Sequence, residues 1–308
     1  MNLKPITQTK LYCLDNYFFE FVKLYEENIL PNKILLTGLK GSGKSTLAYH
    51  FVNYISSQNE KYPYDLKNFS INENNKSFKL ILNNILPNFY LIDIKDEKKN
   101  IDIDQIRDMI LYSNKSSFNN KPKIILIDNI EYLNKNSINA LLKIIEEPNK
   151  NVYFILINHN KKVLQTLKSR CLEFRIFLDN KKSISVVNKI LDLDITKEIN
   201  LELLNYYQTP GVLYYLYKFA KENEIDLKIL NLENFLNKMI NEKYYRKNPY
   251  IKKMTFEYIE MFFKTKIKSN DNWYSLYSYF LKYFKNMNMY NLDEESFFIE
   301  FKSKILNG

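Results

Sequence analysis

Short apolar runs alternate with segments of helical periodicity through roughly the first 178 residues of this chain. The runs are rich in β-branched and aromatic side chains, as in strands that are buried on both faces of a parallel sheet. We therefore predict an α/β domain at residues 1–178, with strands near 34–36, 89–94, 124–127, 152–157 and 172–177. Residues 56–77 are rich in Asn, Ser, Lys and Glu, and this composition predicts a surface excursion rather than a packed element.

The strand pattern ends near residue 178, and only helical periodicity follows. Apolar residues recur at helical spacing in three segments, which predicts a small helical domain at 179–228, with helices near 184–193, 201–207 and 212–222. A second helical domain is predicted at 229–308. Its aromatic side chains are expected to form the core of a helix bundle rather than a base-stacking platform, because no strand pattern accompanies them. They include Phe262, Phe263, Trp273, Tyr277, Phe280 and Phe284.

Three of the five glycines of the chain lie within six residues, in the sequence GLKGSGKST at 38–46. This stretch matches the phosphate-binding pattern G-x-x-x-x-G-K-[ST], and it stands between a predicted strand and an amphipathic helix predicted at 47–55. Glycine lets the backbone bend sharply and approach a phosphate without a Cβ in the way. A strand–turn–helix without a ligand is the alternative, but the agreement of loop, lysine, hydroxyl and flanking elements favours a nucleotide site. Its predicted residues are Gly38, Gly41, Ser42, Gly43, Lys44, Ser45 and Thr46.

The predicted ligand is ATP or its product ADP, with Mg²⁺. In a loop of this type Lys44 reaches the β- and γ-phosphates, and the Ser45 hydroxyl holds the metal ion. Asp128 ends the apolar strand KIILID and is the second predicted Mg²⁺ contact, in the manner of a Walker B aspartate. Asn129 follows where many such ATPases carry a glutamate that activates water. An amide cannot accept a proton as a carboxylate does, so we expect weak or no hydrolysis, with Glu131 a less favoured base.

Neighbouring elements place further polar residues. Asn158 ends the strand beside the Walker B strand, where its amide is expected to reach the γ-phosphate as a sensor-like group. Arg170 follows a short helix predicted at 161–168, and it is either a surface ion pair or a finger that reaches a neighbouring subunit's nucleotide. Glu146 and Glu147 lie at the negative end of a predicted helix. They are either solvated charges or a contact for a basic partner surface.

The net charge of the chain is +10, which suits a polyanionic partner, but Lys, Asn and Ile abound throughout the sequence. Charge alone therefore leaves nucleic-acid contact and biased composition as equal alternatives. The two cysteines are far apart and only two histidines are present, so we expect no zinc site and no disulfide. No apolar run approaches the ~18 to 20 residues of a membrane span and no signal-peptide pattern opens the chain, so we expect a cytoplasmic location and no membrane partner.

A resemblance to a known family rests on three stretches. The run NALLKIIEEP at 139–148, with the strand after it, and Ser169-Arg170-Cys171 closely resemble the AAA+ proteins of the bacterial DNA polymerase III clamp loader. IDQIR at 103–107 resembles the helix before Walker B in this family. With the P-loop, the resemblance spans roughly 31–178, and 207–211 extends it weakly. It implies an AAA+ domain followed by a helical lid and a helical collar that holds a ring together, which fits the two predicted helical domains.

Within this family the chain most resembles the delta prime subunit. It lacks the acidic Walker B pair, the four-cysteine zinc module and the long C-terminal extension that are typical of the gamma/tau motor subunit. It also has Val212 where an arginine commonly contacts the phosphate. Together with Asn129, this departure predicts nucleotide binding with weak or absent turnover. The resemblance further implies that Arg170 acts in trans, on the ATP of an adjacent subunit.

The resemblance implies a part in opening a ring-shaped sliding clamp and placing it on primer–template DNA, together with gamma/tau and delta subunits, in a DNA polymerase III holoenzyme whose polymerase site lies in another chain. A gamma/tau-like motor, a stand-alone P-loop ATPase of DNA recombination or repair, and an interaction protein with a vestigial site stay open as alternatives. ATP turnover by the isolated chain separates the motor from the delta prime interpretation, and complex formation separates both from the stand-alone ATPase. The ring position and the DNA-contacting residues stay open as well.

Overall fold

The computed structural model describes residues 3–95, 98–147, 151–160, 164–247, 249–269, 273–290 and 292–306. The chain divides into two units: residues 1–186 with 209–211, and residues 187–208 with 212–308. The first unit contains a parallel sheet covered by helices, and the second is helical, so the predicted fold class is confirmed. The finer division into nucleotide-binding, lid and collar domains, with borders at 178 and 228, stays a prediction.

Five parallel strands form the sheet of the first unit, in the order β2-β3-β4-β1-β5. Every residue of β3 is buried, as expected of a strand with helices over both faces. The strands are those predicted, although β2 and β5 end earlier than their apolar runs do; their bounds are β1 (Lys33–Thr37), β2 (Phe89–Ile92), β3 (Lys123–Ile127), β4 (Val152–Asn158) and β5 (Leu172–Arg175).

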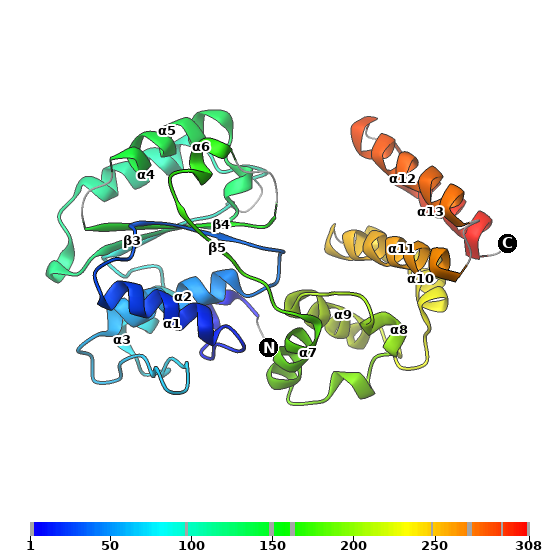
Figure 1. Ribbon diagram of the computed structural model, residues 1–308, viewed down its shortest axis with the longest axis horizontal. Coiled ribbons are helices and arrows are strands. Elements are labelled where there is room, and N and C mark those ends of the chain that lie inside the picture. The colour runs from blue at the N-terminus through cyan, green and yellow to red at the C-terminus, as the bar shows by residue number, and fades with distance from the viewer. Residues whose placement is uncertain are drawn as a thin grey trace. The chain divides into compact units, whose positions relative to one another are not determined.

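Helices cover the two faces of this sheet (Figure 1). One face carries α1 (Asp15–Glu26), α2 (Lys44–Ser57) and α3 (Lys76–Leu82), and the other carries α4 (Ile103–Asn114), α5 (Lys135–Glu146) and α6 (Gln165–Lys168). The second face packs through an apolar core that includes Ile106 and Met109 of α4 and Leu141 and Ile145 of α5. Because α2 begins at the P-loop lysine and is buried along most of its length, the sheet and this helix hold the loop between them.

The segment that connects α2 to α3 contains no helix or strand and is largely exposed or half-buried, as predicted for a surface excursion at 56–77, but a few of its side chains are packed. Tyr64 and Ile71 are buried within it. The Tyr64 hydroxyl donates to Nδ1 of the fully buried His50 at 2.8 Å, and the Asn75 side chain caps α3 by accepting from the Phe78 amide. Two apolar anchors therefore fix a segment whose composition is otherwise polar.

The remaining elements are helices: α7 (Asn180–Leu191), α8 (Leu201–Leu204), α9 (Pro210–Glu222), α10 (Leu232–Asn241), α11 (Pro249–Ser269), α12 (Trp273–Tyr290) and α13 (Glu294–Phe301). α8 is shorter than the helix predicted at 201–207. In the second unit the ring of Phe263 lies 5.6 Å from that of Phe280 and 5.7 Å from that of Phe301. All three side chains are buried, as expected of a bundle core. None of the helices in the described ranges is long and apolar enough to cross a membrane.

Candidate nucleotide-binding site

The P-loop follows β1 and has a backbone shape that requires glycine. Gly38, Gly41 and Gly43 have φ angles of 149°, 85° and 89°, which side-chain-bearing residues rarely adopt. A Cβ on Gly38 would also lie 2.4 Å from the carbonyl oxygen of Ile176, and one on Gly43 would lie 2.8 Å from Cδ1 of Leu14. The loop is thus bent tightly against its surroundings.

The N-terminus of α2 opens directly from this loop. Gly43 is its N-cap residue, and no side chain of the described residues caps the helix there. The first amides of a helix lack intrahelical acceptors and lie at the positive end of the helix dipole, so they suit an anion. Ser42 and Ser45 are buried beside them, and Thr46 is half-buried.

Lys44 is folded into its own loop. Its Nζ donates to the carbonyl oxygens of Gly38 and Leu39, at 2.8 and 2.7 Å, and the side chain is 2% exposed. Burial lowers the pKa of Lys44 to about 8, against the opposing effect of the carboxylates of Asp128 and Glu131. A cation that has lost most of its water in this way fits a phosphate ligand, because a phosphate would restore the interactions that burial removed.

The two predicted Mg²⁺ contacts lie side by side. The Ser45 hydroxyl donates to Oδ2 of Asp128 at 2.6 Å, and the backbone N–H of Asn129 donates to Oδ1 at 2.8 Å. Burial alone would raise the pKa of Asp128, but the hydrogen bonds from His159 and Ser45 outweigh it and hold this pKa below its usual value. The carboxylate is therefore ionised at neutral pH, and it forms with Ser45 a pair of hard oxygen ligands of the kind that Mg²⁺ prefers.

His159 is a member of this site that sequence reasoning missed. Its Nε2 donates to Oδ1 of Asp128 at 3.1 Å, and its backbone amide donates to Oε2 of Glu131 at 3.3 Å. The available signal was its position directly after β4, since β4 pairs with β3 and the residue after each strand lies at the same edge of the sheet. His159 thus holds the carboxylate of Asp128 through Oδ1, whereas Ser45 donates to Oδ2.

Asn129 stands where many such ATPases carry the glutamate that activates water, and its side chain is hydrogen-bonded to Asp93. It has a left-handed conformation, with φ 58° and ψ 43°, and its Nδ2 donates to Oδ1 of Asp93 at 2.7 Å. Asp93 follows β2, and burial raises its pKa, with a further contribution from Asp128 that the hydrogen bond from Asn129 opposes. The carboxylate of Asp93 therefore lies beside Asn129 at the end of β3, although Asp93 itself follows β2. The sequence analysis did not predict this residue as part of the site.

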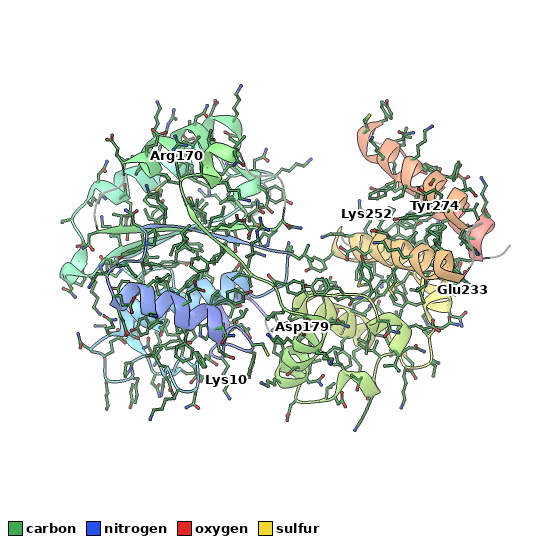
Figure 2. The ribbon with its side chains drawn as sticks, viewed as in Figure 1. Lys10, Arg170, Asp179, Glu233, Lys252 and Tyr274 are labelled. Atoms are coloured by element: carbon green, nitrogen blue, oxygen red, sulfur yellow. The ribbon has the colours of Figure 1, made fainter. Side chains whose placement is uncertain are left out.

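Asn158 and Arg170 lie in different surroundings. Asn158 is buried at the end of β4, level in register with Thr37 of β1, where the P-loop begins. Arg170 lies after α6, on the face of the sheet that α5 covers (Figure 2). Among the described residues its hydrogen bonds go to Oε1 of Glu146, at 2.8 Å, and to the carbonyl oxygen of Thr166, at 2.7 Å, and not to the P-loop.

The ion pair with Arg170 gives Glu146 a basic partner within the same chain, while Glu147 is exposed. Pro148, which we expect to end the helix, lies outside the described residues, as do the first positions of the helix predicted at 161–168. Both cysteines are free, and no group of three or more His, Cys, Asp or Glu side chains in the described part of the chain is placed to hold a metal ion. A Mg²⁺ ion in this site would therefore depend on phosphate oxygens and water in addition to Ser45 and Asp128.

The chain is similar in sequence to subunits of DNA polymerase III. The sequence profile described as "DNA polymerase III, delta subunit" matches residues 15–179. A DNA polymerase III subunit delta' of Pseudomonas aeruginosa is 29% identical over 140 residues, which are 45% of this chain and 41% of that protein. A DNA polymerase III subunit gamma of Buchnera aphidicola subsp. Schizaphis graminum is 33% identical over 144 residues, 46% of this chain and 37% of that protein. The chain thus spans less than half the length of these relatives. A solved gamma subunit-related protein of Thermotoga maritima shares 18% identity, with a TM-score of 0.47 and coverage of 91% of this chain and 96% of that one.

Proposed function

The chain belongs to the DNA polymerase III delta-subunit family, and from this premise we propose that it is a delta prime-like clamp-loader subunit that binds ATP or ADP with Mg²⁺. The observation that carries the nucleotide part is the buried ammonium of Lys44 inside a glycine loop, next to the joined Ser45 and Asp128. These groups fit a phosphate chain and a hard divalent cation.

Each part of the site has a distinct task in this proposal. The amides at the start of α2 bind phosphate oxygens, and Lys44 neutralises their charge. Ser45 and Asp128 hold the cation, and His159 keeps the carboxylate of Asp128 in place. Asn158 is the sensor-like group for a γ-phosphate.

We assign the delta prime role rather than that of a motor because of two residues. Asn129 is an amide whose Nδ2 is occupied by Asp93, and Val212 offers no cation for a phosphate. Relatives of both kinds are similar to this chain, at 29% identity for a delta' subunit and 33% for a gamma subunit, so the distinction rests on these two positions. We therefore expect nucleotide binding with weak or absent hydrolysis by the isolated chain.

Arg170 is the residue through which this chain would act on a neighbour. About a third of its side chain is exposed, and its contact with Glu146 is open to solvent. An arginine released from such a contact presents a planar fork of donors to a neighbour's ATP. The proposed partners are gamma/tau and delta subunits, the sliding clamp and primer–template DNA within the assembled loader, and the proposed location is the cytoplasm.

Calorimetry with Mg-ADP tests the nucleotide site. The wild-type chain should bind, and Lys44→Ala should weaken binding by about 10- to 100-fold, because hydrogen bonds from a charged group contribute about 1.5–3 kcal/mol. Lys282→Ala is the control for loss of an exposed lysine, since Lys282 lies on α12 in the other unit of the chain and should leave the affinity within about twofold. No binding by the wild type at millimolar Mg-ADP or Mg-ATP would overturn the proposal.

A further inference from the structure

A short segment outside the phosphate-binding motif makes two hydrogen bonds to the P-loop. The Thr209 hydroxyl donates to the carbonyl oxygen of Lys40 at 2.8 Å, and the Gly211 amide donates to the carbonyl oxygen of Gly41 at 3.0 Å. The segment Thr209–Gly211 packs within the same unit as the P-loop, although it is far from it in sequence. We call this segment the clip.

The two backbones touch with no side chain between them. A Cβ on Gly211 would lie 2.7 Å from Cα of Gly41, and a Cβ on Gly41 would lie 2.7 Å from Oγ1 of Thr209. Position 41 is one of the variable positions of the phosphate-binding pattern, so the pattern itself does not require a glycine there. The clip supplies a reason for that glycine, in addition to its φ of 85°.

The direction of the two hydrogen bonds matters for anion binding. In a trans peptide unit the C=O and N–H groups point in opposite directions, and the described chain contains no cis peptide bond. Because the Thr209 hydroxyl holds the carbonyl group of Lys40 toward the clip, the N–H of Gly41, which belongs to the same peptide unit, points away from the clip. The hydrogen bond from Gly211 fixes the next peptide unit, which joins Gly41 to Ser42. The N–H of this unit, on Ser42, donates to the carbonyl oxygen of Leu39 at 3.3 Å and closes a turn.

We propose that Thr209 and Gly211 are positioning residues for nucleotide binding: they hold the peptide units of Lys40 and Gly41 so that the loop is already shaped for phosphate. The clip does not need to touch the ligand to set its affinity, because a loop that is ordered before binding loses less entropy on binding. The proposal rests on the nucleotide binding argued above and names the residues that prepare the site for a nucleoside di- or triphosphate.

Calorimetry with Mg-ADP on the full chain tests the clip. Thr209→Val keeps the shape of the side chain and removes the donor, so ADP should bind about 3- to 10-fold more weakly. Thr209→Ser keeps the hydroxyl and should stay within about twofold of the wild type. Gly211→Ala forces the two backbones apart and should weaken binding by on the order of tenfold or more. If this variant does not fold, the two threonine variants still decide the question.

Thr265→Val is the matched control for the substitution itself. Its hydroxyl also donates to backbone carbonyls, those of Phe262 at 2.8 Å and Met261 at 3.0 Å within α11, in the other unit of the chain. This variant should leave ADP affinity unchanged. Hydrogen exchange adds a readout that a merely structural role would not move: in ligand-free Thr209→Val, exchange should accelerate at residues 38–44 and not across the sheet.

The outcomes separate the clip from the nucleotide site itself. Wild-type affinity in Thr209→Val, or equal weakening in Thr209→Ser and Thr209→Val, would overturn the positioning role while leaving the proposed function intact. A wild-type chain that binds no ADP would overturn the proposed function and the role of the clip together.

Discussion

Replacing Arg170 by alanine distinguishes a finger that acts in trans from a surface ion pair. Arg170 contacts Glu146 at 2.8 Å, and the two side chains are 35% and 51% exposed. An ion pair this open to solvent contributes about 0–1 kcal/mol to folding. In the isolated chain, Arg170→Ala should therefore lower the free energy of unfolding by at most about 1 kcal/mol and leave ADP affinity unchanged.

The expected effect in the assembled loader is larger. Loss of a cation that stabilises the transition state of a neighbour's ATP should lower clamp- and DNA-stimulated ATPase by about 10- to 1000-fold. Loss of the ion pair alone, worth at most about 1 kcal/mol, corresponds to no more than about fivefold. The two explanations therefore differ in magnitude. Arg170→Lys should restore activity only partly, because an ammonium lacks the planar fork of the guanidinium.

Glu146→Ala is the matched control, because it breaks the same ion pair and leaves the arginine in place. We expect this variant to keep normal stimulated ATPase. The assay compares loaders reconstituted with wild-type, Arg170→Ala and Glu146→Ala chains, after their assembly has been shown to be equal. Normal ATPase and clamp loading by the Arg170→Ala complex would refute the finger, and an equal loss in both variants would show that the ion pair matters instead.

Three further predictions concern turnover and stability. The isolated chain should hydrolyse ATP poorly, and robust steady-state turnover would favour a motor role. Asn129→Glu should raise the rate of ATP hydrolysis, and Asn129→Glu combined with Asp93→Asn should raise it further. In the single variant the new carboxylate would be repelled by that of Asp93, which now accepts a hydrogen bond from Asn129 at 2.7 Å. Equal rates in the single and double variants would contradict this reasoning. Burial lowers the pKa of His50 from 6.5 to about 4, so the stability that its neutral form provides is complete above pH 6.5 and is lost as the pH falls toward 4. Between pH 7.5 and 4.5, urea denaturation should show the wild type losing about 2–3 kcal/mol more than His50→Gln, whereas equal losses would show that burial of His50 is not the cause.

The fold was predictable where its signals are local in sequence. The apolar runs of the strands and the glycine pattern of the P-loop are each contained in a few residues, and their positions were correct. The packing of the loop after α2 was not predictable, because Tyr64 is an isolated aromatic in a polar segment and its partner His50 lies on the preceding helix. The composition of such a segment reflects its many polar residues, whereas its packing depends on the few side chains that are buried.

The site was predictable in its phosphate-binding part and not in its surroundings. Ser45 and Asp128 come together as the motif spacing suggests. Asp93 and His159 reach Asn129 and Asp128 only because β2 and β4 flank β3, and strand order is not written in the local sequence. The ion pair of Arg170 likewise joins α5 to the turn after α6.

The central claim is that this chain is a subunit of a clamp loader, and the mass of the complex tests it most directly. The purified chain is mixed with the gamma/tau and delta subunits of its own organism, and native mass spectrometry is recorded with and without Mg-ATP. We predict a complex that contains this 37.1 kDa chain and that forms more completely with ATP. The claim would be contradicted if the other subunits assembled together while this chain stayed at its free mass under both conditions.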